Sequence, residues 1–209
     1  MMWVVFIILS ACGGTQAAVP TQAAGNPPDG MAQAVFAGGC FWCMEKPFER
    51  IDGVISVESG YTGGIEKKPA YKSVARGETG HFEAIRVVFS PEKVTYAELL
   101  NIFWTNIDPT QSNGQFCDKG DQYRSAIFVA NADEQKAARA SKSSIADRLG
   151  RSVVTPILPA STFWLAEEYH QDFYKKNPTR YKSYRAGCGR DHRLQQLWGE
   201  AAGTGAIQP

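Results

Sequence analysis

Two cysteines three positions apart are the residues of this chain best suited to do chemistry. Cys40 and Cys43 lie in the segment GGCFWCMEKPF, residues 38–48, directly after a pair of glycines. This spacing fits a structural disulfide, half of a metal site, or a reactive thiol with a second thiol that resolves it. The other cysteines and histidines help to choose among these uses.

The remaining cysteines argue against a disulfide framework and against a metal site. Apart from Cys12, the chain has four cysteines, which are too few to build a fold of this size from disulfides. A zinc site needs four ligands, usually in two close pairs, but Cys117 and Cys188 are single and far apart. The three histidines have no paired spacing either. We therefore expect no metal and a redox role for Cys40.

Cys40 follows two glycines and begins a predicted helix. At a helix start, unpaired backbone N–H groups and the helix dipole favour a thiolate, which is the nucleophilic form of cysteine. A second group fits the same chemistry: Glu83 alternates with Ile85 and Val87 on one face of a predicted strand. A carboxyl group among apolar side chains keeps its proton near neutral pH and can act as an acid. The alternative is an exposed glutamate paired with a nearby arginine.

Alternating and helical hydrophobic patterns predict the elements that position these groups. We expect strands at 32–39, 53–61, 81–89, 122–130 and 152–158, and helices at 40–51, 71–75, 95–108, 131–150 and 166–177. The first helix is expected to be interrupted or kinked at Pro47, and the last to stop before Pro178. Thr95 with Glu98 has the spacing of a capping box, and Asn131 is a predicted helix cap. The order of elements favours an α+β two-layer sandwich.

The N-terminus differs in composition from the rest of the chain. Residues 1–11 are almost uniformly apolar and end at Cys12 in LSAC, which resembles the lipobox of bacterial lipoprotein signals, although no Lys or Arg precedes the apolar run. We expect a signal peptide over 1–12 with Cys12 lipidated, a flexible linker over 13–30, one domain over 31–198 and a loose tail over 199–209. The protein is then exported and tethered to the membrane, facing the periplasm or the cell exterior; the alternative is a cytoplasmic protein.

Charge and composition exclude some partners. Lys and Arg number 22 against 21 Asp and Glu, which gives a net charge of +1, and no basic run occurs. This balance predicts no binding to nucleic acid. No apolar stretch reaches the roughly 20 residues of a spanning helix, so contact with a membrane is expected only through a lipid anchor.

Seven segments in order resemble the A-type peptide methionine sulfoxide reductases. They are GCFWC at 39–43, GYTGG at 60–64, PAYKSV at 69–74, TGHFEAIRVVF at 79–89, DPTQ at 108–111, CDKGDQYRSAIF at 117–128 and AEEYHQDF at 166–173. The resemblance covers nearly all of residues 35–198. It implies a ferredoxin-like core, no cofactor, and the reduction of methionine-S-sulfoxide, free or in peptides and proteins.

The resemblance also implies roles for individual residues. Cys40 is the nucleophile and Glu83 the proton donor; Tyr71 and Tyr123 lie beside Glu83, Asp118 holds a water or the substrate amide, and Phe41 and Trp42 form an apolar wall for the substrate methyl group. His170 in the last segment is expected to be structural. The chain departs from the family at Cys43, where most members have glycine, and in its C-terminal segment RAGCGRDHRLQQLWG. Both departures leave the recycling step open.

Recycling needs a second cysteine that converts the sulfenic acid on Cys40 into a disulfide, which a thioredoxin-like dithiol then reduces. Cys188 is expected to do this first, because neighbouring glycines give its segment the freedom to move after the last helix. Cys43 comes second, since its disulfide would enclose Phe41 and Trp42 in a small ring. Cys117 comes third, because it adjoins Asp118.

Two other functions fit parts of the sequence. A general thiol–disulfide oxidoreductase would use Cys40 and Cys43 as a CxxC pair and would need neither an acid at position 83 nor an aromatic pocket. A lipid-anchored binding module with an inactive site would not depend on Cys40.

Overall fold

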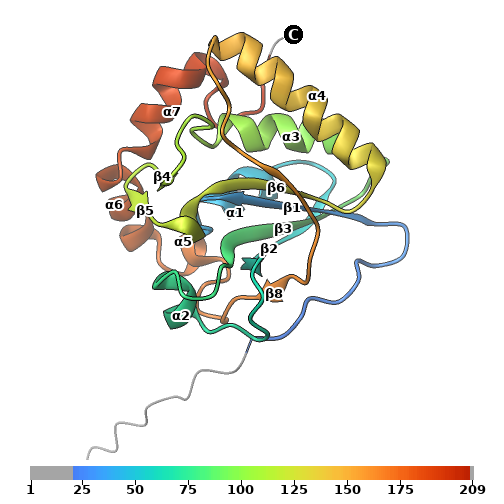
Figure 1. Cartoon of the computed structure of the whole chain (residues 1–209), viewed down its shortest axis with the longest axis vertical. Coiled ribbons are helices and arrows are strands. Elements are labelled where there is room, and N and C mark those ends of the chain that lie inside the picture. Colours follow the sequence, from blue (N-terminus) through green and yellow to red (C-terminus); the bar gives the residue numbers. More distant parts are fainter. Residues whose placement is uncertain (1–20, 208–209) are drawn as a thin grey trace, which may run out of the picture.

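Six strands form one mixed sheet at the centre of the chain, which the structure, a computed structural model, describes over residues 21–207 (Figure 1). The strand order is β7-β6-β1-β3-β2-β8, and neighbours are antiparallel except β6 and β7. The strands are β1 Ala32–Gly38, β2 Val54–Thr62, β3 Phe82–Phe89, β6 Ser125–Val129, β7 Ile157–Pro159 and β8 Trp164–Leu165; β4 Gly114–Gln115 and β5 Asp118–Lys119 form a separate hairpin. The fold is therefore α+β.

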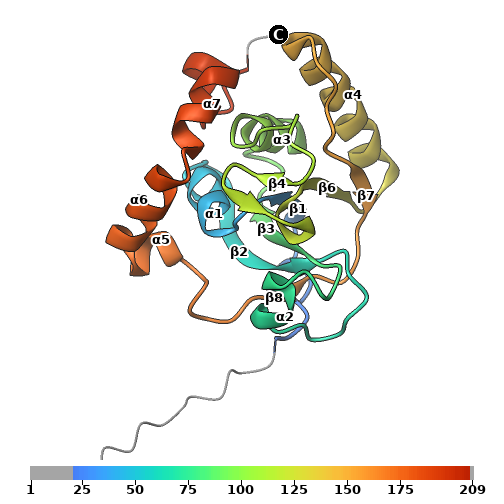
Figure 2. The ribbon, with the colours of Figure 1, turned by 60° about the vertical axis from the view of Figure 1, so that its left-hand side comes forward.

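Helices cover one face of the sheet and connecting segments cover the other. The helices are α1 Trp42–Glu49, α2 Tyr71–Ala75, α3 Tyr96–Thr105, α4 Ala132–Leu149, α5 Phe173–Lys176, α6 Pro178–Gly187 and α7 Arg190–Trp198, with 3-10 turns η1 Asp121–Tyr123 and η2 Gly199–Ala201. Helices α1, α3, α4 and α7 share the main core with Phe36 and Ile85, whose strands are direct neighbours. The opposite face packs Val35, Ala84 and Phe128 against Phe163. Figure 2 shows α3 and α4 on one side of the sheet and α6 and α7 in succession beside α1.

Strand β3 places the candidate acid. All eight residues of β3 are buried, because β1 and β2 pair with its two edges and both of its faces are covered. Glu83 therefore lies inside the molecule, on the same side as Ile85 and Val87 of the main core.

The predicted helix caps are confirmed. The Thr95 side chain accepts from the Glu98 backbone, and the Glu98 side chain accepts from the Thr95 backbone, so α3 begins with a full capping box. The Asn131 side chain accepts from the Glu134 backbone at the start of α4. Helix α4 ends at Gly150, whose φ of 58° suits glycine.

The last part of the chain differs from the expectation. Residues 166–172 are not helical, α5 spans only Phe173–Lys176, and two further helices follow. Pro178 starts α6 rather than ending a helix, since proline is well tolerated at the first helical position. Pro47 lies inside α1, which continues to Glu49 without interruption. Only the end of the strand expected at 152–158 forms, as β7, because only that part pairs with β6.

Both ends of the described chain are packed more closely than expected. Ala24 donates to the Phe163 carbonyl, and Leu165 donates to the Gln22 carbonyl, so residues 21–25 run along β8 instead of belonging to a flexible linker. Near the C-terminus, Gly203 donates to the Thr105 carbonyl, so the expected loose tail packs on α3. The expected signal peptide with Cys12, and linker residues 13–20, lie outside the described residues. None of the described helices has the length and apolar character needed to cross a membrane.

Candidate active site

The glycine pair before Cys40 is required by close packing. A Cβ at Gly38 would lie 2.6 Å from the Met44 Sδ, and Gly39 has a φ of 82° and faces Gln115. These two residues let the chain turn sharply from β1 into α1. Cys40 sits just before the helix with 6% of its surface exposed, and Cys43 in the first turn has 1%. The turn thus places two thiols side by side inside the protein.

The two thiols titrate as a pair. Burial raises the pKa of the Cys40 thiol, and a hydrogen bond with Cys43 and the negative charge of Glu83 raise it further. The hydrogen bond from Cys40, together with the charges of Arg190 and Arg185, lowers the pKa of Cys43 to about 6 despite its burial. The pair therefore carries one negative charge at neutral pH. The raised pKa of Cys40 differs from the expected preference for a thiolate at this position, and burial is its main cause.

Glu83 supplies an acid beside this pair. Only 1% of Glu83 is exposed, and burial raises the pKa of its carboxyl group to about 8, although a hydrogen bond from the Phe41 backbone N–H works in the opposite direction. The N–H of Phe41 lies 3.2 Å from Oε2 of Glu83. Below about pH 8 the carboxyl group is protonated and can donate.

A small cavity brings the predicted catalytic and substrate residues together. It has a volume of about 90 Å³ and is lined by Cys40, Phe41, Trp42, Tyr71, Glu83, Asp118, Tyr123 and Tyr184. Burial raises the pKa values of the Tyr71 and Tyr123 hydroxyls, so both are hydrogen-bond donors at neutral pH. Burial also raises the pKa of Asp118. Of the residues predicted for the site, only the three candidate resolving cysteines do not line the cavity.

Aromatic side chains fix one wall of the cavity. Phe41 is buried, while Trp42 stacks on Phe173 with ring centroids 3.6 Å apart. The Trp42 Nε1–H donates to Nδ1 of His170 over 3.0 Å. Burial lowers the pKa of His170 to about 4, so this histidine is neutral and orients Trp42. Its structural role agrees with the sequence prediction.

Two residues of the site were not predicted from the sequence. Glu167 accepts a hydrogen bond from the Tyr61 hydroxyl and another from the Tyr71 backbone, so it holds the start of α2 at the cavity. Tyr184 on α6 lines the cavity and donates to Oδ2 of Asp118. Its spacing of four residues before Cys188 is a helical repeat, and recognising a helix there would have placed both side chains on one face.

Cys117 and Cys188 form a disulfide next to the cavity. Their Cα atoms are 5.0 Å apart, and the bond joins the segment before Asp118 to the end of α6. Cys117 is exposed, whereas Cys40 and Cys43 are buried and free. The ligand atoms of Cys117, Asp118 and Cys188 lie within 4.8 Å of one another, as in a metal site, but both sulfurs are used by the disulfide.

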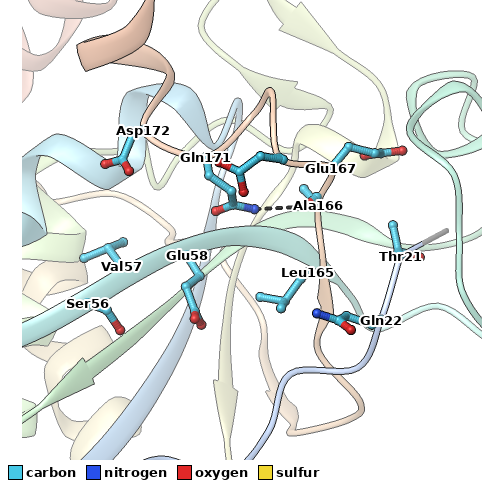
Figure 3. A pocket seen from close by; sticks show the side chains of 11 residues that line it. Thr21, Gln22, Ser56, Val57, Glu58, Leu165, Ala166, Glu167, Gln171 and Asp172 are labelled. Carbon is cyan, nitrogen blue, oxygen red and sulfur yellow. Dashed lines mark hydrogen bonds between the residues drawn. The ribbon is translucent and has the colours of Figure 1, made fainter. Parts of the chain in front are cut away.

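A larger pocket has Glu167 in its wall (Figure 3). Its volume is about 540 Å³, and its walls include Glu58, Glu167, Glu168 and Asp172. Glu58 is paired with Arg86, and the wall carries no cysteine. This pocket therefore lacks a nucleophilic thiol, and the predicted nucleophile and acid both line the smaller cavity.

Comparisons with known proteins identify one family that the chain resembles over most of its length. The family model "Peptide methionine sulfoxide reductase" matches residues 32–202. "Peptide methionine sulfoxide reductase MsrA 2" of Caulobacter vibrioides is 52% identical over 167 residues, which cover 79% of this chain and 85% of that protein. Reduced Mxr1 from Saccharomyces cerevisiae is similar in structure with a TM-score of 0.70 and 32% identity, covering 76% of this chain and 91% of the yeast chain. Mxr1 in complex with Trx2 matches with a TM-score of 0.51 and 20% identity over 72% and 89% of the two chains.

The paired titration of Cys40 and Cys43 can be measured by thiolate absorbance near 240 nm. The Cys117–Cys188 disulfide, called the outer disulfide below, is kept intact. We expect one thiolate to form with a midpoint at about pH 6, because the pKa of Cys43 is lowered to that value. Cys43→Ser should remove this step, since the remaining Cys40 has a raised pKa. A step at pH 6 that persists in Cys43→Ser would contradict this account of the pair.

Proposed function

Because the chain belongs to the peptide methionine sulfoxide reductase family and reduces methionine sulfoxide, we propose that Cys40 attacks the sulfoxide sulfur while Glu83 protonates the oxygen. The observation that best supports this proposal is that the buried carboxyl group of Glu83 lines the same cavity as the buried thiol of Cys40. A sulfoxide is a poor electrophile until its oxygen is protonated or strongly hydrogen-bonded, so a thiolate and an acid are needed together.

The first step releases methionine and leaves a sulfenic acid on Cys40. A proton moves from Cys40 to Cys43 across their hydrogen bond, which puts the negative charge on the attacking sulfur. The new bond joins the Cys40 sulfur to the substrate sulfur, and the proton of Glu83 goes to the oxygen. The substrate S–O bond then breaks, an S–O bond forms on the Cys40 sulfur, and the S–S bond breaks with its electron pair staying on the methionine sulfur, which gives methionine and the Cys40 sulfenic acid.

The other cavity residues orient the substrate in this proposal. Tyr71 and Tyr123 donate hydrogen bonds to the sulfoxide oxygen, and Asp118 holds a water or the substrate amide. Phe41 and Trp42 form the apolar wall for the methyl group. The support is that all of them line one cavity of about 90 Å³ with Cys40. We assign the S epimer, free or in peptides and proteins, and no cofactor.

We further propose that Cys43 closes the first disulfide with Cys40, releasing water. Cys43 is already hydrogen-bonded to Cys40, whereas Cys188, which the sequence placed first, is bonded to Cys117. Cys188 then attacks the Cys40 sulfur of that disulfide and releases Cys43 as a thiol. Cys117 next attacks the Cys188 sulfur of the new Cys40–Cys188 disulfide, which releases Cys40 and leaves the Cys117–Cys188 bond. These steps would leave Cys40 and Cys43 as free thiols and Cys117 bonded to Cys188, and the same arrangement in the structure supports the proposal.

A thioredoxin-like dithiol reduces the outer disulfide in this scheme. Cys117 is exposed, so a protein thiol can reach it, whereas the inner pair is buried. The complex of Mxr1 with Trx2 supports a partner of this kind.

Two further properties belong to the same proposal. The four strands β1, β2, β3 and β6 with α1 and α3 have the order β-α-β-β-α-β and lie in the sheet as β6-β1-β3-β2, which supports a ferredoxin-like core. For location, the apolar residues 1–11 before Cys12 support a signal peptide and a lipid anchor, and hence a catalytic domain tethered outside the cytoplasmic membrane.

The role of Glu83 is tested by Glu83→Gln, which keeps the shape but cannot release a proton. We expect the single-turnover rate with methionine-S-sulfoxide to fall by about 10² to 10⁴. In the wild type this rate should rise through about pH 6, as the pair ionises, and fall above about pH 8, as Glu83 loses its proton. The exposed Glu78 serves as a control through Glu78→Gln, and the R epimer as a control substrate. An unchanged rate in Glu83→Gln would rule out this acid.

The order of disulfides is tested by giving fully reduced protein one equivalent of substrate, quenching with acid and mapping peptides by mass. We expect a Cys40–Cys43 bond first and a Cys117–Cys188 bond later. Cys188→Ser should keep the first bond but lose most thioredoxin-coupled turnover. A first bond between Cys40 and Cys188, or normal coupled turnover in Cys188→Ser, would contradict this order.

The anchor is tested by cell fractionation. We expect the wild-type protein in the membrane fraction, while Cys12→Ser leaves it unprocessed or soluble, because the cysteine that carries the lipid is gone. Wild-type protein found wholly in the soluble fraction with Met1 intact would contradict lipidation.

A further inference from the structure

We propose that Tyr184 is a further residue of the active site that donates a hydrogen bond to the sulfur of Cys40, and that the Cys117–Cys188 disulfide holds it in place. This inference rests on the proposed role of Cys40 as the nucleophile. Tyr184 lies on α6, far in sequence from the other cavity residues, yet it lines the same cavity. Its ring meets Trp42 edge-on, with centroids 5.9 Å apart at 82°.

The Tyr184 hydroxyl has two possible acceptors in the cavity. It donates to Oδ2 of Asp118, and the thiol of Cys40, whose pKa Tyr184 lowers, lines the same cavity. The hydroxyl has one hydrogen, which turns toward Cys40 when negative charge forms on that sulfur. Tyr184 thereby favours the thiolate against burial, which has the opposite effect on the pKa of Cys40.

Several other groups act on Cys40 and must be kept constant in a test. Those facing it are Cys43 from α1, Glu83 from β3, Tyr71 from α2, Asp118 from β5 and Tyr123 from η1. Cys43 and Glu83 both raise the pKa of Cys40, whereas the hydrogen bond of Tyr184 lowers it. Tyr184 therefore opposes the effects of Cys43 and Glu83 and favours the attacking form of Cys40.

The outer disulfide connects the two segments that hold this hydroxyl. Cys117 directly precedes Asp118, and Cys188 follows Tyr184 by one helical turn, with its backbone N–H donating to the Tyr184 carbonyl. Helix α6 fully buries only Tyr181 and is otherwise largely exposed. Few core contacts therefore fix the end of α6, and the covalent link restricts its movement relative to Asp118.

The test measures the rate at which iodoacetamide alkylates Cys40 between pH 6 and 11 in a full-length Cys43→Ser chain, whose outer disulfide is confirmed by peptide mass. We expect an additional Tyr184→Phe to raise the midpoint of alkylation by about one pH unit and to slow the reaction at pH 7 about tenfold. Tyr174→Phe is the matched control, because that hydroxyl binds Glu49 away from the cavity. Its midpoint should be unchanged.

The role of the Cys117–Cys188 disulfide in holding Tyr184 is tested by removing the disulfide. Cys117→Ser and Cys188→Ser are added together, or the disulfide is reduced chemically, and circular dichroism checks the fold. Either change should raise the midpoint as Tyr184→Phe does, and adding Tyr184→Phe should then have little further effect. An unshifted midpoint in Tyr184→Phe would overturn the hydrogen bond from Tyr184 to Cys40. If Tyr184→Phe still raises the midpoint by about one pH unit in the chain without the disulfide, the disulfide does not hold Tyr184 in place. Because alkylation needs no sulfoxide, loss of sulfoxide reduction with the expected midpoints would refute the proposed function alone.

Discussion

The burial of a carboxyl group and two thiols in one place is the constraint on which the rest of this structure depends. In water Glu83 would be ionised near neutral pH, and neither thiol would carry a charge. Burial raises the pKa of Glu83 to about 8, so an acid persists beside a pair that shares one negative charge. The protein has to exclude water from this space and still compensate for the buried charge.

The compensation comes from groups placed by distant parts of the chain. Arg190, at the start of α7, is 1% exposed, and its Nη2 donates to the carbonyls of Gly38 and Asn106 over 2.8 and 3.0 Å. Its charge lowers the pKa of Cys43 and opposes the rise at Asp118. A buried guanidinium is costly without a negative partner, and the thiol pair supplies that charge nearby. The last helix therefore contributes to the chemistry as well as to the core.

Much of this arrangement could be predicted from local patterns. The alternation of Glu83 with Ile85 and Val87 makes its burial one of two possible arrangements, and the structure shows that it is buried. The caps of α3 and α4 depend on neighbouring residues in sequence. The C-terminal helices do not follow from a reading of Pro178 as a helix end, because proline also suits the first turn of a helix, as it does in α6. The roles of Glu167 and Tyr184 depend on contacts with residues 66 to 106 positions away, and no local pattern shows such contacts. The pairing of Cys117 with Cys188, over 71 positions, is likewise a tertiary result.

The central claim is that Glu83 is a protonated acid at neutral pH. Infrared difference spectroscopy, comparing the wild type with Glu83→Gln over a pH series, measures this directly, because the C=O stretch of a protonated carboxyl group is separate from the bands of a carboxylate. The account predicts a protonated band that disappears with a midpoint at about pH 8 and is absent from Glu83→Gln. A band that is already lost at about pH 5, near the ordinary value for glutamate, would contradict it.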